Sequence, residues 1–331
     1  MILCEDLAYK ESLILQDIER SIKIFAAVDK ITEAIKNPRR LNILIQCRNI
    51  EESYFSIYSS ICIFLAEAKE LIPNDIDVKE LSHQYMRMIK TLIENQRQGL
   101  PNSLFGGLSD VGFGLHSLST VANYHKNFID SLNELILDSS KKNIKKYKRN
   151  LDYVKISSFD TISGLTGILV YLLFYKDEKD IRNHIKEALS YLVSLTHDRE
   201  VYGHLVPNYY ISSKNQLLDI EKDIYVNGNF NFGLSHGTAG ILAALSIALL
   251  EGVEVIGQKR AIERILDDLK RFHYVDNNGA IYWPGIIKFE DYINGHCTIN
   301  GKRAGWCYGS PGIARAMYIA GNAIDDKEAI E

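Results

Sequence analysis

Three seven-residue segments of the chain align with one another without gaps. Each carries two glycines three residues apart, and the second glycines, at positions 167, 240 and 312, are 73 and 72 residues apart. Two earlier stretches resemble weaker copies, the first of which has lost both glycines. The three segments are 163–169, 236–242 and 308–314, and the weaker copies are 57–63 and 107–113. Such a recurrence predicts a repeat fold, in which each unit buries its apolar face against its neighbours.

Each glycine pair leads into a segment that is predicted to be a buried helix. Residues 168–175 and 241–250 are apolar on nearly every side, which is typical of a helix with no face in water. The next segment of each unit has apolar residues on one face only. These two stripes are Ile181, Ile185, Ala188, Leu189, Leu192 and Val193, and Ala261, Ile262, Ile265, Leu266, Leu269 and Phe272. The alternation predicts an all-α fold with an inner and an outer layer of helices, whose glycine turns meet at one end.

Two segments interrupt this helical pattern. Residues 199–231 contain the β-favouring Tyr209-Tyr210-Ile211, and residues 273–304 contain a hairpin-type turn, 276–279, between two apolar runs. We interpret both as strand-containing insertions that lie over the mouth of the helical body, within a single domain of residues 1–331. Residues 1–50 are predicted to form a mostly helical lead-in.

Composition excludes several classes of protein. The formal net charge of −4 and the pI near 6.2 give no basic footprint for nucleic acid. Five cysteines without regular spacing fit a reducing compartment better than a disulfide framework. The first residues lack a signal-peptide pattern, and no run of about 18 apolar residues could span a membrane. The sequence therefore predicts a soluble, cytoplasmic protein.

One basic cluster stands out, and its interpretation stays open. It consists of Lys141, Lys142, Lys145, Lys146, Lys148 and Arg149. Such a cluster is either a solvated helix end or a surface that attracts an acidic peptide or anionic lipid.

Five polar side chains stand next to the repeated turns. Asp160 and Arg303 lie four residues before Gly164 and Cys307, His236 directly precedes Gly237, and Cys307-Tyr308 precede Gly309. Taken singly, each has an ordinary structural explanation: a helix cap, a core histidine, a surface arginine, a buried thiol and a core aromatic ring. Because they fall at corresponding places of a repeat, we expect Asp160, His236, Arg303, Cys307 and Tyr308 to converge in space.

These residue types would suit a site at which charge develops near a metal or a carbonyl group. A thiolate such as that of Cys307 is a good zinc ligand, a histidine exchanges protons near neutral pH, and an arginine can hold an oxyanion. His296-Cys297 is a second possible pair of metal ligands, in a segment that is predicted to be a loop. The residues thus predict a site without specifying its reaction.

Two strings, Gly233-Leu234-Ser235-His236-Gly237 and Trp306-Cys307-Tyr308-Gly309, resemble hallmark motifs of the lanthionine synthetase C family, the lanthipeptide (lantibiotic) cyclases. Residues 160–167 resemble a third family segment, and the likeness extends over roughly residues 50–325. The resemblance implies an α/α toroid of helical hairpins around a zinc ion. It also implies addition of precursor-peptide cysteine thiols to dehydroalanine or dehydrobutyrine, which forms thioether rings.

The resemblance also implies roles for the matching residues. Cys307 corresponds to the first zinc ligand, His236 and Asp160 to an acid/base pair, and Arg303 and Tyr308 to further active-site positions. The substrate would be a dehydrated lanthipeptide precursor. The implied partners are a dehydratase and a membrane exporter, which would hold the protein at the inner face of the membrane.

The sequence departs from the family pattern after Cys307. The expected second and third zinc ligands, an adjacent Cys-His before a glycine, do not follow it. We therefore expect a C-terminally truncated, incomplete ring with one zinc ligand of three, whose uncovered apolar face would promote association. Three functions stay open. They are a zinc-dependent cyclase, a non-catalytic protein that binds a precursor peptide or a partner, and a different toroid enzyme such as a glycoside-processing one. Zinc binding itself is also open.

Overall fold

The computed structural model describes residues 16–18, 20–23, 25, 27, 50–71, 77–95, 100–121, 125–296 and 304–330. These residues belong to two compact units, Met1–Glu134 and Leu135–Glu331, each of which is described by itself. No helix in the described ranges is both long enough and apolar enough to cross a membrane. The single domain over residues 1–331 stays a prediction.

The first unit is built around two helices that pack closely together. These are α4 (Ile50–Glu67) and α6 (Leu108–Val121), accompanied by the short η1 (Lys69–Leu71) and by α5 (Val78–Asn95). A methyl group added at Gly114 of α6 would come within 3.0 Å of the Ser59 Cα in α4, so a glycine permits this approach. Helix α7 (Lys126–Arg149) begins in this unit and continues into the second.

The two weaker repeat copies adopt different local structures. Gly107 directly precedes α6, so residues 107–113 do begin a helix as predicted. Residues 57–63 lie inside α4, so this weaker copy does not begin a helix as the other copies do. The physical reason is that this stretch has no glycine or other residue to stop a helix, and the helix continues through it.

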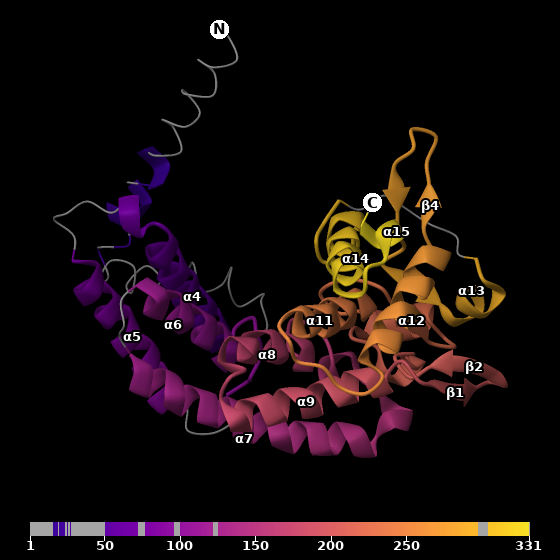
Figure 1. Ribbon diagram of the computed structural model, residues 1–331, viewed down its shortest axis with the longest axis horizontal. Helices are drawn as coiled ribbons and strands as arrows, with labels where there is room; N and C mark the ends of the chain where they lie inside the picture. The colour runs from indigo at the N-terminus through magenta and orange to yellow at the C-terminus, as the bar shows by residue number, and fades with distance from the viewer. Residues whose placement is uncertain are drawn as a thin grey trace, which may run out of the picture. The chain divides into compact units, whose positions relative to one another are not determined.

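The second unit alternates buried and amphipathic helices. The buried ones are α8 (Leu165–Leu172), which continues into η4 (Leu173–Tyr175), and α11 (Thr238–Leu250); α14 (Ser310–Ile324) follows the third glycine turn but has an exposed face with Ala314, Arg315 and Tyr318. Helix α11 lies between α8 and α14 (Figure 1). The amphipathic ones are α9 (Lys179–Ser194) and α12 (Gln258–Arg271), which bury the predicted apolar stripes. The 3-10 turns η2 (Leu151–Tyr153) and η3 (Ile156–Ser158) precede α8, and α15 (Lys327–Ile330) follows α14.

Short strands interrupt these helices, as the sequence predicts. In the described ranges they form three two-stranded antiparallel sheets: β1 (Asp198–Val201) with β2 (His204–Pro207), β3 (Asn229–Asn231) with β6 (Ile286–Lys288), and β4 (Tyr274–Val275) with β5 (Ile281–Tyr282). The last pair is the predicted hairpin around Asp276, and it projects beyond the helices (Figure 1). The short helices η5 (Ser213–Asn215), α10 (Asp219–Ile224) and α13 (Phe289–Asn294) complete the insertions.

The predicted strand at residues 209–211 does not form. Only Ile211 makes an isolated bridge, to Asn229. The Tyr209 side chain is buried, and its hydroxyl hydrogen-bonds the carboxylate of Asp268 on α12, which also accepts a hydrogen bond from Tyr292 at 2.8 Å. Side-chain packing on α12 therefore takes the place of sheet pairing.

Candidate active site

Asp160 lies in the turn that leads into α8, and its carboxylate is buried. One oxygen, Oδ1, accepts hydrogen bonds from the Ser163 backbone amide at 2.9 Å and from the Ser163 hydroxyl at 3.1 Å. The other oxygen, Oδ2, is hydrogen-bonded to Nδ1 of His236. Gly164, and not Asp160, occupies the N-cap position of α8. The carboxylate therefore closes its own turn and also holds a histidine from the next one.

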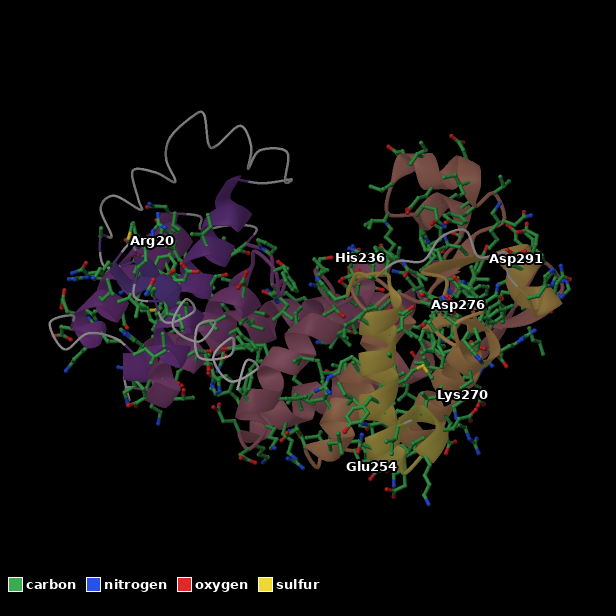
Figure 2. The ribbon with its side chains drawn as sticks, turned by 90° about the horizontal axis from the view of Figure 1, so that it is seen from above. Arg20, His236, Glu254, Lys270, Asp276 and Asp291 are labelled. Carbon is green, nitrogen blue, oxygen red and sulfur yellow. The ribbon has the colours of Figure 1, made fainter. Side chains whose placement is uncertain are left out.

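His236 lies in the corresponding turn before α11 (Figure 2). Its side chain is 20% exposed, whereas that of Asp160 is fully buried. Because Nδ1 is engaged by the carboxylate, Nε2 is the ring nitrogen left to exchange a proton with a bound molecule. A buried carboxylate behind a partly exposed imidazole is a suitable arrangement for general acid/base chemistry.

Hydrogen bonds from backbone amides and side-chain hydroxyls to backbone carbonyls link the three turns in sequence. The Thr161 amide donates to the Ser235 carbonyl at 2.9 Å, and the Thr161 hydroxyl donates to the Leu234 carbonyl at 2.8 Å. In the same way, the Ser235 amide and hydroxyl both donate to the Cys307 carbonyl at 3.2 Å. These bonds bring Asp160, His236 and Cys307 to one end of the second unit.

In the second and third turns, the second glycine of the pair permits this close packing. A methyl group added at Gly312 would lie 1.8 Å from the Trp306 carbonyl oxygen, and one added at Gly240 would lie 2.5 Å from the Thr161 hydroxyl. Neither residue has a positive φ. Lack of space, and not backbone conformation, therefore explains why the repeat keeps a glycine there.

Cys307 and Tyr308 are brought to the same place by the third turn. The Cys307 thiol is free and partly exposed. The Tyr308 ring lies beside that of His236, with 6.0 Å between the ring centroids. Burial raises the pKa of the Tyr308 phenol, while a hydrogen bond with the Asn231 side chain acts in the opposite direction.

The described residues do not by themselves form a zinc site. Among them, no group of three histidine, cysteine or carboxylate side chains is arranged to hold a metal ion. Arg303 and Cys297 lie outside the described residues, and His296 is exposed at the end of α13. Cys307 is thus a single ligand candidate, and a single thiolate does not fit a tetrahedral zinc ion.

Two residues in contact with the predicted site were not singled out from the sequence. Ser163 holds the Asp160 carboxylate, and it occupies the repeat position that His236 and Tyr308 occupy in the other two turns, so the alignment carried a signal for it. Asn231 contacts Tyr308, but it precedes its turn by five residues and belongs to a short strand. No feature of the sequence marked Asn231.

Comparison with known proteins agrees with this architecture. The family model of the lanthionine synthetase C-like proteins matches residues 52–331. The nisin biosynthesis protein NisC of Lactococcus lactis subsp. lactis is 29% identical over 272 residues, which are 80% of this chain and 62% of NisC. The solved structure of a nisin cyclase superimposes with a TM-score of 0.72 and 26% identity, over 82% of this chain and 65% of the cyclase.

The chain therefore spans less than two thirds of the length of either relative. The likeness to the cyclase structure confirms the predicted fold class, an α/α toroid with short β insertions. Since the family model covers most of the chain, the protein belongs to the lanthionine synthetase C-like family.

Proposed function

We propose that the protein acts as a lanthipeptide cyclase, which adds cysteine thiols of a dehydrated precursor peptide to dehydroalanine or dehydrobutyrine. The observation that carries the proposal is the Asp160–His236 pair at the meeting point of three turns, next to Cys307 and Tyr308. Membership of the family, and the likeness to a protein named nisin cyclase, support the same reaction.

The reaction adds S–H across a carbon–carbon double bond. The thiol gives up its proton to Nε2 of His236 as the sulfur bonds to the β-carbon of the dehydro residue, an enolate develops, and that proton is then delivered to the α-carbon. His236 supplies that proton from Nε2, while Asp160 accepts a hydrogen bond from Nδ1–H and stabilises the protonated ring. Tyr308, beside His236, donates a hydrogen bond to the enolate oxygen. Arg303 would add positive charge near the same oxygen.

Zinc stays a prediction for this chain. When bound, it would lower the pKa of the attacking thiol. Cys307 would supply one ligand, and the other ligands would have to come from outside the described residues. Zinc content of the purified protein, measured with and without the Cys307→Ser substitution, tests this point directly. The dehydratase and the exporter complex are likewise expectations carried by the family resemblance, and the cytoplasmic location is an expectation from the cysteine pattern.

The test of the reaction uses a synthetic peptide with one cysteine and one dehydroalanine. Ring formation leaves the mass unchanged but removes the free thiol, so the product escapes alkylation by N-ethylmaleimide. We expect the protein with added Zn²⁺ to accelerate this loss, and His236→Asn to lower the rate by about 10²- to 10⁴-fold. His204→Asn, an exposed histidine on β2, is the matched control.

Two results would contradict the cyclase proposal. One is an equal rate for the wild-type protein and His236→Asn. The other is binding of the peptide without any loss of thiol, which would instead identify a non-catalytic, peptide-binding member of the family.

A further inference from the structure

Two glycines that are far apart in the chain, Gly233 and Gly285, both lie close to Tyr308. A methyl group added at Gly233, just after β3, would lie 2.8 Å from Cδ1 and 3.2 Å from Cε1 of Tyr308. A methyl group added at Gly285, just before β6, would lie 3.2 Å from Cβ and 3.3 Å from Cδ1 of the same residue. Neither glycine has a positive φ, so both are needed for the space that they leave.

Pairing between the two insertions holds these glycines in place. Strand β3 pairs antiparallel with β6, with Asn231 opposite Ile286. The ladder continues beyond the strands, because the Phe232 amide donates to the Gly285 carbonyl at 2.8 Å. The position of the Tyr308 ring is therefore set by a sheet whose strands are more than fifty residues apart in the chain.

Asn231 contacts the polar end of the same ring. Its side chain is buried, and its Oδ1 accepts a hydrogen bond from the Gly233 amide at 3.0 Å. Its side chain also lies near the Tyr308 hydroxyl, where hydrogen bonding from Asn231 acts to lower the phenol pKa. A hydrogen bond that lowers a phenol pKa stabilises the charged oxygen, so the group of Asn231 that acts on Tyr308 is its NH₂ donor. We call Asn231, Gly233 and Gly285 the tyrosine cradle.

We propose that Asn231 is a positioning residue for Tyr308, and that the β3–β6 sheet serves to fix the Tyr308 hydroxyl beside His236. This inference rests on the proposed function, in which Tyr308 belongs to the active site. The β3–β6 sheet would thus contribute to catalysis by positioning Tyr308. When the Tyr308 O–H donates a hydrogen bond to an enolate, the phenol oxygen becomes more negative. A donor aimed at this oxygen stabilises that negative charge.

The experiment places 3,5-difluorotyrosine at position 308 of the full chain and follows its titration by fluorine NMR. The fluorines lower the phenol pKa into a range in which the protein stays folded. Removing the donor with Asn231→Leu should raise the pKa at position 308 by about one pH unit or more. Asn229→Leu is the matched control: Asn229 is also buried on β3, but its amide donates to Gln216 at 2.7 Å instead.

A second variant separates positioning from folding. Gly285→Ala removes no polar group and adds one methyl group against Tyr308, 3.0 Å from its backbone oxygen and 3.3 Å from Cδ1 of its ring. We expect it to move the fluorine resonance at position 308 and to lower the rate of thiol loss by about tenfold, with little change in KM. An unchanged titration in Asn231→Leu, or an unchanged resonance and rate in Gly285→Ala, would overturn the inference.

The two readouts also separate this inference from the proposed function. If the wild-type protein forms no thioether while Asn231→Leu still shifts the titration, the cradle is supported and the cyclase proposal is contradicted. If thioether forms but neither variant affects Tyr308, the cyclase proposal stands and the cradle is wrong.

Discussion

Asp110, in the first turn of α6 in the first unit, and Asp160, in the turn before α8 in the second, are both carboxylates beside repeated glycine turns, yet they have different partners. Asp110 Oδ2 accepts hydrogen bonds from the Gly106 amide at 2.7 Å and from the Ser56 hydroxyl at 2.6 Å, both within its own unit. Asp160 also uses one oxygen locally, on Ser163, but its other oxygen reaches His236 in the next turn. One turn uses its carboxylate to stabilise itself, and the other supplies it to a partly exposed imidazole.

This difference shows what turns a repeated structural feature into a candidate site. Burial raises the pKa of Asp110, and its hydrogen bonds only partly oppose that effect. The groups that donate hydrogen bonds to Asp110, the Ser56 hydroxyl and the Gly106 amide, do not titrate near neutral pH. For Asp160, the decisive feature is the titratable partner from a neighbouring turn.

The largest expected effect is on the rate of thioether formation. Asp160→Asn should lower it by about 10²- to 10³-fold, because a neutral amide stabilises the protonated imidazole poorly and favours the wrong tautomer. Asp110→Asn, an identical change at the other turn, should leave the rate within about twofold. The thiol-alkylation assay measures the rate for both variants. An equal loss of rate in the two variants would contradict the different roles of the two carboxylates.

The next effect concerns close packing in the two units. Gly312→Ala should lower the free energy of unfolding by roughly 3 kcal/mol or more, because the added methyl group would meet a backbone oxygen at 1.8 Å. Gly114→Ala in α6 should lower it by only about 1 kcal/mol, since the nearest atom, the Ser59 Cα, lies at 3.0 Å. Urea unfolding measures the difference, and a larger loss for Gly114→Ala would contradict the geometry.

A further effect depends on pH and on a buried histidine. His184 of α9 is buried, and its Nε2 lies 2.9 Å from the Ser140 hydroxyl of α7. Burial lowers the pKa of His184 to about 4. Since the unfolded chain then binds a proton more readily, this contribution to stability is complete above the unfolded pKa of about 6.5 and is lost as the pH falls towards 4.

The variant His184→Gln tests this linkage, because glutamine can keep the bond to Ser140 without titrating. Between pH 7 and pH 4, the wild-type protein should lose up to about 3 kcal/mol more of its unfolding free energy than the variant does. Urea unfolding at a series of pH values gives both curves. Parallel curves would show that His184 is not buried as a neutral side chain.

Much of the second unit could be predicted from the sequence, because its constraints are local. The glycine at position 312 is required where a backbone oxygen leaves no room for a side chain, and such a requirement appears directly as a repeated letter. The meeting of Asp160 with His236 followed from their equivalent places in the repeat. Residues 57–63 misled us because they match the repeat only in apolar character, which an uninterrupted helix also has.

The tyrosine cradle could not be predicted in this way. Strands β3 and β6 have three residues each, and they lie in different insertions. Such short strands carry no periodic signal, and their pairing depends on the helices that bring the insertions together. Asn231 takes its place from that pairing, so the sequence alone contains nothing that links it to Tyr308.

The smallest effect is expected at Ser163, which supports the Asp160 carboxylate. Ser163→Ala removes the hydroxyl bond to Oδ1 at 3.1 Å but keeps the backbone amide bond at 2.9 Å. Because one of two donors remains, the rate of thioether formation should fall only about threefold to tenfold, in line with about 1 kcal/mol for a single hydrogen bond. Combined with Asp160→Asn, the serine change should have no additional effect, since it acts only through that carboxylate. Additive losses in the double variant would mean that Ser163 contacts the substrate itself.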